Sequence, residues 1–303
     1  MAPEWLWIPL TVWAGFAQTL RNAAQRHLVG QVGTLGATLV RFLYGLPFAA
    51  IWFLVVLMLR EASVPGVSPA FVAWVVEGGA CQIVATALLL RVMADRNFGL
   101  GVAYSKTELV QVTVFAAVFL ADPVTLATVV AVGLATLGVL MLSPVEPSRP
   151  LASFVTGWAS RPALLGFASG AGFALAAVGY RGAALELDAP YALAAAYTLL
   201  WAQTVQVLLL GGWLLLRNLP VLVALAREWR TSAFAGFMGT AASAGWFTAM
   251  AIEPVAHVRT LGLVELLFSL AVARRFFRER LTGLEVVGVG LLAVGLVVIT
   301  LSA

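Results

Sequence analysis

Ionisable and polar side chains interrupt an apolar stretch in the first half of the chain. Residues 101–115 read GVAYSKTELVQVTVF and contain Tyr104, Lys106, Glu108 and Gln111. In a helix, Tyr104, Glu108 and Gln111 follow i, i+4 and i+7 and therefore share one face, whereas Lys106 points elsewhere. Side chains of these types can bind a charged solute or carry a proton.

Glu108 is the most informative of these residues. An ionised side chain inside a bilayer costs at least about 2.5 kcal/mol and usually faces a cavity or a partner. Two interpretations stay open: Glu108 is a buried partner of Arg41 or Lys106, or it binds a substrate amine or carries a coupled proton. Lys106 is the single lysine of the chain, and it either lines the same site or extends its ammonium group from the interface to lipid headgroups.

Further polar side chains lie on other apolar stretches. Gln18 shares a helical stripe with Asn22 and Gln25, so we expect it to face a cavity. Arg41, with Tyr44 nearby, either binds a substrate carboxylate through a two-point contact or serves as a structural counter-charge. Aromatic and amide side chains of the second half suit a small amphipathic or zwitterionic solute. The complete set of candidate substrate-binding residues is Gln18, Arg41, Tyr44, Tyr104, Lys106, Glu108, Gln111, Tyr180, Trp201, Trp246 and Glu265.

The composition indicates that membrane helices carry these residues. Hydrophobic residues make up 62% of the chain and charged residues 11%, with a mean hydropathy of +0.98, whereas soluble domains carry about 25% charged residues. We therefore expect an all-α integral membrane protein. Cys81 is the single cysteine and there are two histidines, which excludes a disulfide framework and most metal centres, so we expect no cofactor. No basic soluble segment is present to hold nucleic acid.

Apolar runs separated by charged, proline or glycine residues predict ten membrane helices. The first lacks the basic region of a signal peptide and is expected to stay in the protein. Residues 144–160 contain three prolines and cannot form one continuous helix, so they are predicted to link two five-helix halves, residues 1–143 and 161–303. The predicted spans are 5–25, 33–59, 69–92, 98–120, 123–142, 162–184, 190–216, 231–252, 256–277 and 281–302.

The two halves are predicted to be repeats, because a shift of 157 residues aligns them without gaps. Glu108 falls on Glu265, and Gly138 falls on Gly295. Five helices per half is an odd number, so the second half enters the membrane from the opposite side. Inverted repeats of this kind are typical of secondary transporters, whose substrate site lies in a central cavity between the halves. The glycines of residues 133–138 and 288–295 predict close helix packing.

Two motifs resemble a known family. The stretch FFRERLTGLEVVGVGLLAVGLVVIT, residues 276–300, resembles the acidic turn and glycine-containing helix that end each repeat of the EamA-like branch of the drug/metabolite transporter superfamily. The stretch TLVRFLYGLPFAAIW, residues 38–52, resembles the arginine-bearing second helix of that family. The resemblance implies ten helices, a central cavity, and transport of small metabolites without ATP hydrolysis. The chain departs from the family at Ala121-Asp122-Pro123, and at Thr198 where the repeat would place an arginine.

These observations predict a secondary transporter that moves a small amphipathic or zwitterionic metabolite, such as an amino acid, across the bacterial inner membrane by alternating access. Export is the expected direction. An uptake permease for a small organic anion or vitamin, or a lipid flippase on the same fold, is the alternative. An enzyme is not expected, since no nucleophile-and-base set and no metal motif is visible. The expected partners are the solute, the lipid bilayer and a possible coupled proton, in a monomer or homodimer.

The arginines predict the orientation in the membrane. Connections after odd-numbered predicted helices contain thirteen arginines, including Arg21, whereas those after even-numbered helices contain three, namely Arg60, Arg181 and Arg259. Basic residues near helix ends favour the cytoplasmic side. The bias therefore places both termini outside, while the resemblance implies termini inside.

Overall fold

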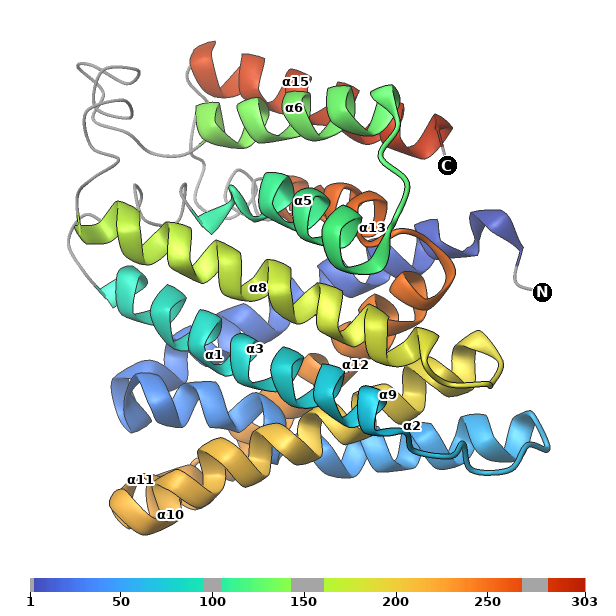
Figure 1. The fold of residues 1–303 in the computed structure, drawn as a ribbon. Helices are drawn as coiled ribbons and strands as arrows, with labels where there is room; N and C mark the ends of the chain where they lie inside the picture. The colour runs from blue at the N-terminus through green and yellow to red at the C-terminus, as the bar shows by residue number, and fades with distance from the viewer. Residues whose placement is uncertain (1–2, 95–104, 143–160, 269–282, 303) are drawn as a thin grey trace. The chain divides into compact units, whose positions relative to one another are not determined.

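The computed structural model describes residues 3–94, 105–142, 161–268 and 283–302, and these residues form helices without a strand (Figure 1). The predicted all-α class is confirmed. The helices are η1 (Glu4–Leu6), α1 (Trp7–Leu43), α2 (Leu46–Leu59), α3 (Pro69–Ala94), α5 (Glu108–Leu120), α6 (Leu126–Leu142), α8 (Arg161–Leu185), α9 (Tyr191–Gln206), the π-helical η2 (Val207–Gly211), α10 (Gly212–Arg217), α11 (Leu219–Arg227), α12 (Trp229–Ile252), α13 (Val255–Leu261) and α15 (Gly283–Leu301).

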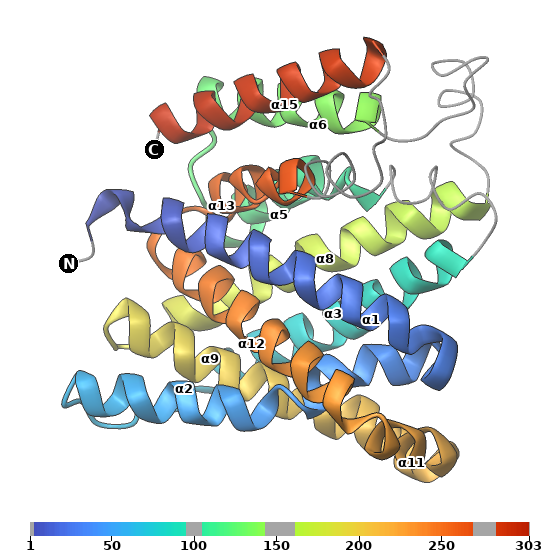
Figure 2. The same cartoon turned by 180° about the vertical axis from the view of Figure 1, so that it is seen from behind.

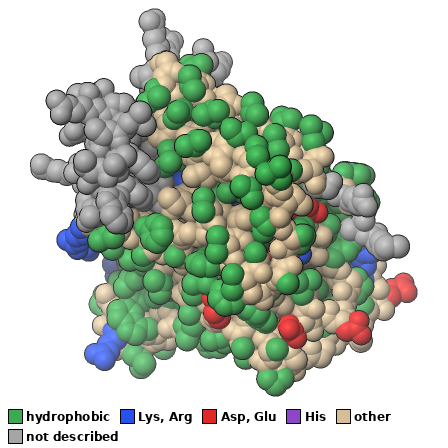
Figure 3. Space-filling model, turned by 45° about the horizontal axis from the view of Figure 1, so that its top comes forward, with side chains coloured by type: hydrophobic (Ala, Val, Ile, Leu, Met, Phe, Trp, Pro, Cys, Tyr) green, Lys and Arg blue, Asp and Glu red, His purple; other side chains and the backbone are tan. Residues whose placement is uncertain are grey.

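Four stretches of helix are long and apolar enough to cross a membrane. Many of the large hydrophobic side chains are exposed, among them Met58, Leu126 and Leu216. Figure 3 shows hydrophobic side chains spread over the visible face, with few charged ones. Large exposed apolar surfaces of this kind are typical of contact with a membrane or with another protein. The four stretches are His27–Leu59, Pro69–Val92, Ala163–Leu185 and Tyr191–Arg217.

The first two predicted spans are not separated where the sequence suggested. Residues 26–32 were expected to connect spans 5–25 and 33–59, but they are helical, and α1 continues to Leu43 through a kink at Gly33. Gly33 has a φ of +71°, a backbone conformation that glycine adopts at little cost. The break before α2 lies at Tyr44 and Gly45, and Pro47 then fits the first turn of α2, where its missing N–H leaves no helical bond unmade.

The chain forms two compact units, each made of two segments. The first unit consists of residues 1–83 and 176–253, and the second of residues 84–175 and 254–303. Helices α3 and α8 each contribute residues to both units.

Within the first unit, α12 lies along α1, and α9 packs on α2 and α12 (Figure 2). Gly245 brings the backbones of α12 and α1 together, because a Cβ atom there would lie 2.8 Å from the carbonyl oxygen of Leu10.

Within the second unit, α6 packs along α15 (Figure 1). A Cβ atom on Gly138 would lie 2.6 Å from the backbone nitrogen of Leu292, and one on Gly295 would lie 2.9 Å from the carbonyl oxygen of Ala131. The predicted packing role is therefore confirmed for Gly138 and Gly295. Gly133 and Gly290 have no described atom within 4 Å of such a position, so they make no such approach in the described part of the chain.

The acidic residue of the first repeat, Asp122, has a structural task. Its carboxylate accepts a hydrogen bond from the backbone N–H of Val255, the first residue of α13, at 3.3 Å. The first N–H groups of a helix have no partner within the helix. Asp122 therefore fixes the start of α13, which carries Arg259.

Replacing Asp122 by alanine is expected to lower the melting temperature, because losing a helix cap costs about 0.5–2 kcal/mol. Thermal unfolding in detergent measures the change. Asp188→Ala is the matched control, since Asp188 is exposed. Equal melting temperatures for the two variants would contradict the capping role.

Candidate functional site

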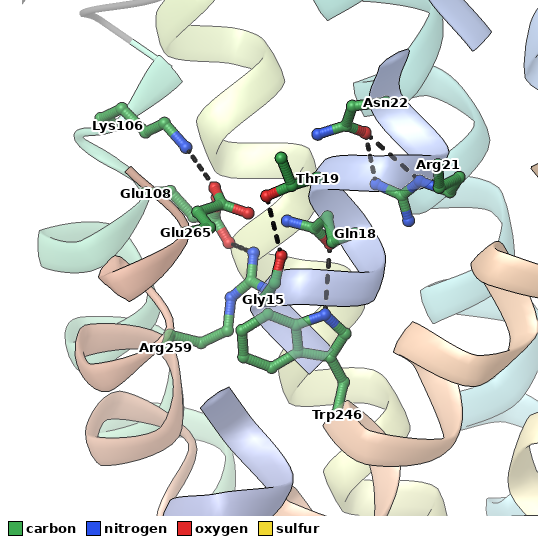
Figure 4. A network of polar contacts seen from close by, with 10 residues as sticks. All are labelled: Gly15, Gln18, Thr19, Arg21, Asn22, Lys106, Glu108, Trp246, Arg259 and Glu265. Carbon is green, nitrogen blue, oxygen red and sulfur yellow. Dashed lines mark hydrogen bonds and ion pairs between the residues drawn. The ribbon is translucent and has the colours of Figure 1, made fainter. Parts of the chain in front are cut away.

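Two ion pairs lie together in the second unit (Figure 4). The Lys106 ammonium donates to Glu265 Oε1 at 2.9 Å, and the Arg259 guanidinium donates to Glu108 Oε1. The charges of Glu108 and Arg259 also act on Lys106, so the four residues form one electrostatic group. We call Lys106, Glu108, Arg259 and Glu265 the charge cluster. Its formal charge is zero, and its side chains are 12–22% exposed.

Interruptions in two helices position the charge cluster. The turn that contains Lys106 and Thr107 precedes α5, which begins at Glu108, and a turn at Gly262 and Leu263 follows α13. At both turns a backbone N–H donates to the carbonyl oxygen three residues earlier, as in a 3₁₀-helix, instead of four residues earlier as in an α-helix. Leu109 N–H donates to Lys106 O, and Glu265 N–H donates to Gly262 O.

These turns interrupt the predicted spans 98–120 and 256–277 in their described parts. Glu108 and Glu265 instead lie at the beginnings of helical segments. The backbone dipole at a helix start favours negative charge. Irregular turns of this kind inside helices often mark functional hinges.

The structure also corrects the expected partners. Glu108 pairs with Arg259, whereas the sequence offered Arg41 or Lys106. Lys106 pairs with Glu265, whereas the sequence offered a place in the same site as Glu108 or an extension to lipid headgroups. Arg259 was missed because it was counted as a loop arginine. Its signal was present, since it lies in an apolar stretch six residues before Glu265.

Gln111 is the further candidate that lies beside the charge cluster. Gln111 donates from Nε2 to Thr107 Oγ1 at 3.0 Å, and its Oε1 is buried without a hydrogen-bond partner among the described residues. Gln111 thus offers an acceptor close to the interruption that holds Glu108. Tyr104 lies outside the described residues. His257 of α13 bonds Thr128 of α6 at 3.0 Å, which ties these helices together.

In the first unit, Gln18 and Trp246 meet. The Trp246 indole N–H donates to Gln18 Oε1 at 3.2 Å (Figure 4). Arg21 and Arg41 are both buried and both lie beside Gly239 of α12. Arg21 donates to Asn22 Oδ1 at 2.8 Å. Since Arg21 lies inside α1, its predicted place in a connecting loop is wrong.

Tyr180 belongs to a buried amide network. Its hydroxyl donates to Gln82 Oε1 at 3.0 Å, and Gln206 Nε2 lies 2.6 Å from the same oxygen. The charges of Arg41 and Glu77 also act on this hydroxyl. Sequence reasoning missed Gln82, Gln206 and Glu77, although a polar residue inside each apolar run was a visible signal. The Oε2 atom of Glu77 is buried with no hydrogen-bond partner in the described residues.

Two candidates of the first unit make contacts with neighbouring helices. Tyr44 donates to the carbonyl oxygen of Leu225 at 3.0 Å. Trp201 packs edge-on against Phe71 and Tyr197, with ring centroids 5.9 and 6.2 Å apart. These contacts order the helices of the unit, and neither joins Tyr44 or Trp201 to the amide network.

Arg181 was predicted to be a loop residue and is instead buried inside α8. Its guanidinium donates to the carbonyl oxygens of Met250 and, at 2.7 Å, Glu253. These carbonyls end α12, where a positive charge is favoured by the helix dipole. Arg181 is therefore a structural residue.

Comparisons with known proteins bear on the fold. No family model matches the chain, and no curated protein matches it. Among 25 matching chains of solved structures, one described as "Crystal structure of protein" superposes with a TM-score of 0.68 over 99% of this chain and 97% of that one. The two sequences are 16% identical. A likeness at this identity shows that the chains share a fold.

Proposed function

We propose that the chain is a secondary transporter that moves a small zwitterionic or amphipathic metabolite, such as an amino acid, across the bacterial inner membrane by alternating access. The proposal includes ten membrane spans in two inverted repeats around a central cavity, and membership of the EamA-like family. Export is the proposed direction.

The charge cluster is the observation that carries this proposal. Ionised side chains inside a membrane are costly and usually serve a solute or ion path. A buried ion pair adds little stability compared with well-packed apolar side chains. Four charges placed at two helix interruptions are therefore better explained by a binding or gating task than by folding.

A zwitterionic solute fits the chemistry of the cluster. Its ammonium group can take the place of Lys106 beside Glu265, and its carboxylate can take the place of Glu108 on Arg259, which presents two parallel N–H donors. The cluster stays neutral when one such solute enters. A solute with a single charge would leave an unpaired charge behind, which is costly in a low-dielectric site.

The pairing also supports the repeat. Glu108 and Glu265 are equivalent under the shift of 157 residues, and each pairs with a cation from the other half of the chain. The helical turns just before them are interrupted at places that correspond to within one residue. Each compact unit likewise combines residues from both halves. Broken helices at corresponding places in two halves are typical of transporter binding sites.

The proposed orientation keeps both termini outside. Four of the counted arginines lie within helices and not in connections between spans, namely Arg21, Arg26, Arg181 and Arg259, and they are removed from the comparison. The remaining arginines still favour the connections after odd-numbered spans, so the bias keeps its direction.

A thermal-shift screen of purified protein tests the proposed function. The panel contains amino acids, nucleosides, vitamins and organic acids. We expect zwitterionic amino acids or close relatives to raise the melting temperature, because a ligand at 100 times its Kd adds about 2.7 kcal/mol to the folded state. Glu108→Gln should lose the shift. Stabilisation by singly charged organic anions alone, retained in Glu108→Gln, would contradict the proposal.

A further inference from the structure

Within residues 191–252 of the first unit, all charged side chains lie in the short segment 217–230. Between Tyr191 and Ile252, the charged residues are Arg217, Arg227, Glu228 and Arg230. The helices on both sides, α9 to α10 and α12, are otherwise uncharged. A membrane–water interface therefore crosses the chain within residues 217–230.

The structure makes this segment a separate short helix. The helical path ends at Asn218, which has φ −153° and ψ 59°, and α11 then runs from Leu219 to Arg227. The inner face of α11 is anchored on the protein, since Leu225 is 1% exposed and its carbonyl oxygen accepts from the Tyr44 hydroxyl. The Val221 side chain packs against Gly36 of α1, because a Cβ atom on Gly36 would lie 2.9 Å from Val221 Cγ1.

The outer side of the segment combines apolar and basic side chains. Leu219, Val223 and Trp229 are 53%, 45% and 56% exposed. Arg217, Arg227 and Arg230 are exposed as well. The Arg230 guanidinium lies over the Trp229 ring at 5.4 Å. Glu228 is the one acid, so the segment has a formal charge of +2.

We infer that α11 with its flanking residues, residues 217–230, is a docking surface for anionic phospholipid headgroups. Guanidinium groups bind phosphate through two parallel N–H donors. Exposed leucine and valine enter the acyl boundary, and tryptophan is enriched at the headgroup level. The net positive charge favours anionic over zwitterionic headgroups, by about fivefold in affinity for each basic residue near the surface. The inference requires that the chain lies in a membrane, and it does not depend on transport.

The test measures the affinity of the detergent-solubilised full chain for phosphatidylglycerol, with phosphatidylcholine as the neutral lipid. The triple variant Arg217→Gln, Arg227→Gln and Arg230→Gln is expected to bind phosphatidylglycerol roughly 100-fold more weakly, with little change for phosphatidylcholine. Arg230→Gln alone should lose about fivefold. Added salt should weaken binding to the native chain, because these charges are solvent-exposed.

The matched control is Arg60→Gln, Arg91→Gln and Arg161→Gln, which removes the same charge from three exposed arginines elsewhere. This control variant should bind phosphatidylglycerol with the affinity of the native chain. Equal losses in both triple variants would overturn the inference, because they would reflect net charge alone. Competition by inorganic phosphate at similar concentration would also overturn it, since the surface would then select a free anion.

Discussion

Replacing Glu108 by glutamine is expected to reduce solute exchange at least about tenfold. The change removes the carboxylate that pairs with Arg259 and leaves a cation in a part-buried site. Removing one partner of a fully buried ion pair can lower the free energy of unfolding by about 3–5 kcal/mol. We expect a smaller loss here, because these side chains are 12–18% exposed and water can solvate the remaining charge. Exchange of labelled solute in vesicles and melting temperature are measured together.

The double variant Glu108→Gln and Arg259→Gln separates binding from folding. With both charges gone, the unpaired cation disappears, so the melting temperature should return toward that of the native chain. Solute exchange should stay low, since the proposed carboxylate site on Arg259 is lost as well. Glu186→Gln, at an exposed acid, is the control for a change of net charge. Recovery of exchange together with stability in the double variant would assign the pair to folding.

Replacing Gly138 by alanine is expected to lower the melting temperature. Its Cβ would lie 2.6 Å from Leu292 N and 2.7 Å from Gly288 O. These are backbone atoms of α15, so the two helices must separate. Overpacking of this kind costs about 1–3 kcal/mol. The melting temperature in detergent measures the loss.

Gly133→Ala is the matched control on the same helix. Nothing lies within 4 Å of its Cβ position among the described residues, and alanine is a better helix former than glycine. The melting temperature should therefore stay the same or rise. A loss equal to that of Gly138→Ala would show that helix α6, rather than its contact with α15, is sensitive to the change.

The all-α class and the apolar helices were predictable because they depend on composition and on local apolar runs. The helix boundaries were harder to predict from the sequence. Arg21 and Arg181 looked like loop residues, since an arginine usually ends a membrane span, yet backbone carbonyls and neighbouring side chains accept their hydrogen bonds inside the fold. Gly33 shows the converse, because a kink at positive φ lets one helix continue where two were expected.

The sequence predicted most residues of the charge cluster but not which of them form ion pairs with each other. Lys106, Glu108 and Glu265 stood out because charge is rare in apolar stretches. Their partners lie 151 and 159 residues away in the sequence, so periodicity on one helix could not identify them. Tyr180 was a candidate, but its partners Gln82 and Gln206 were missed, because neutral amides carry a weaker signal and the three residues come from different helices.

Solute exchange by the purified chain in sealed vesicles tests the central claim most directly. Vesicles loaded with unlabelled solute, chosen from the thermal-shift screen, are diluted into labelled solute, and the accumulated label is followed over time. The account predicts transient accumulation by the native chain, without ATP, and strongly reduced accumulation by Glu108→Gln. Accumulation no faster than in protein-free vesicles, for every solute that stabilises the folded chain, would contradict it.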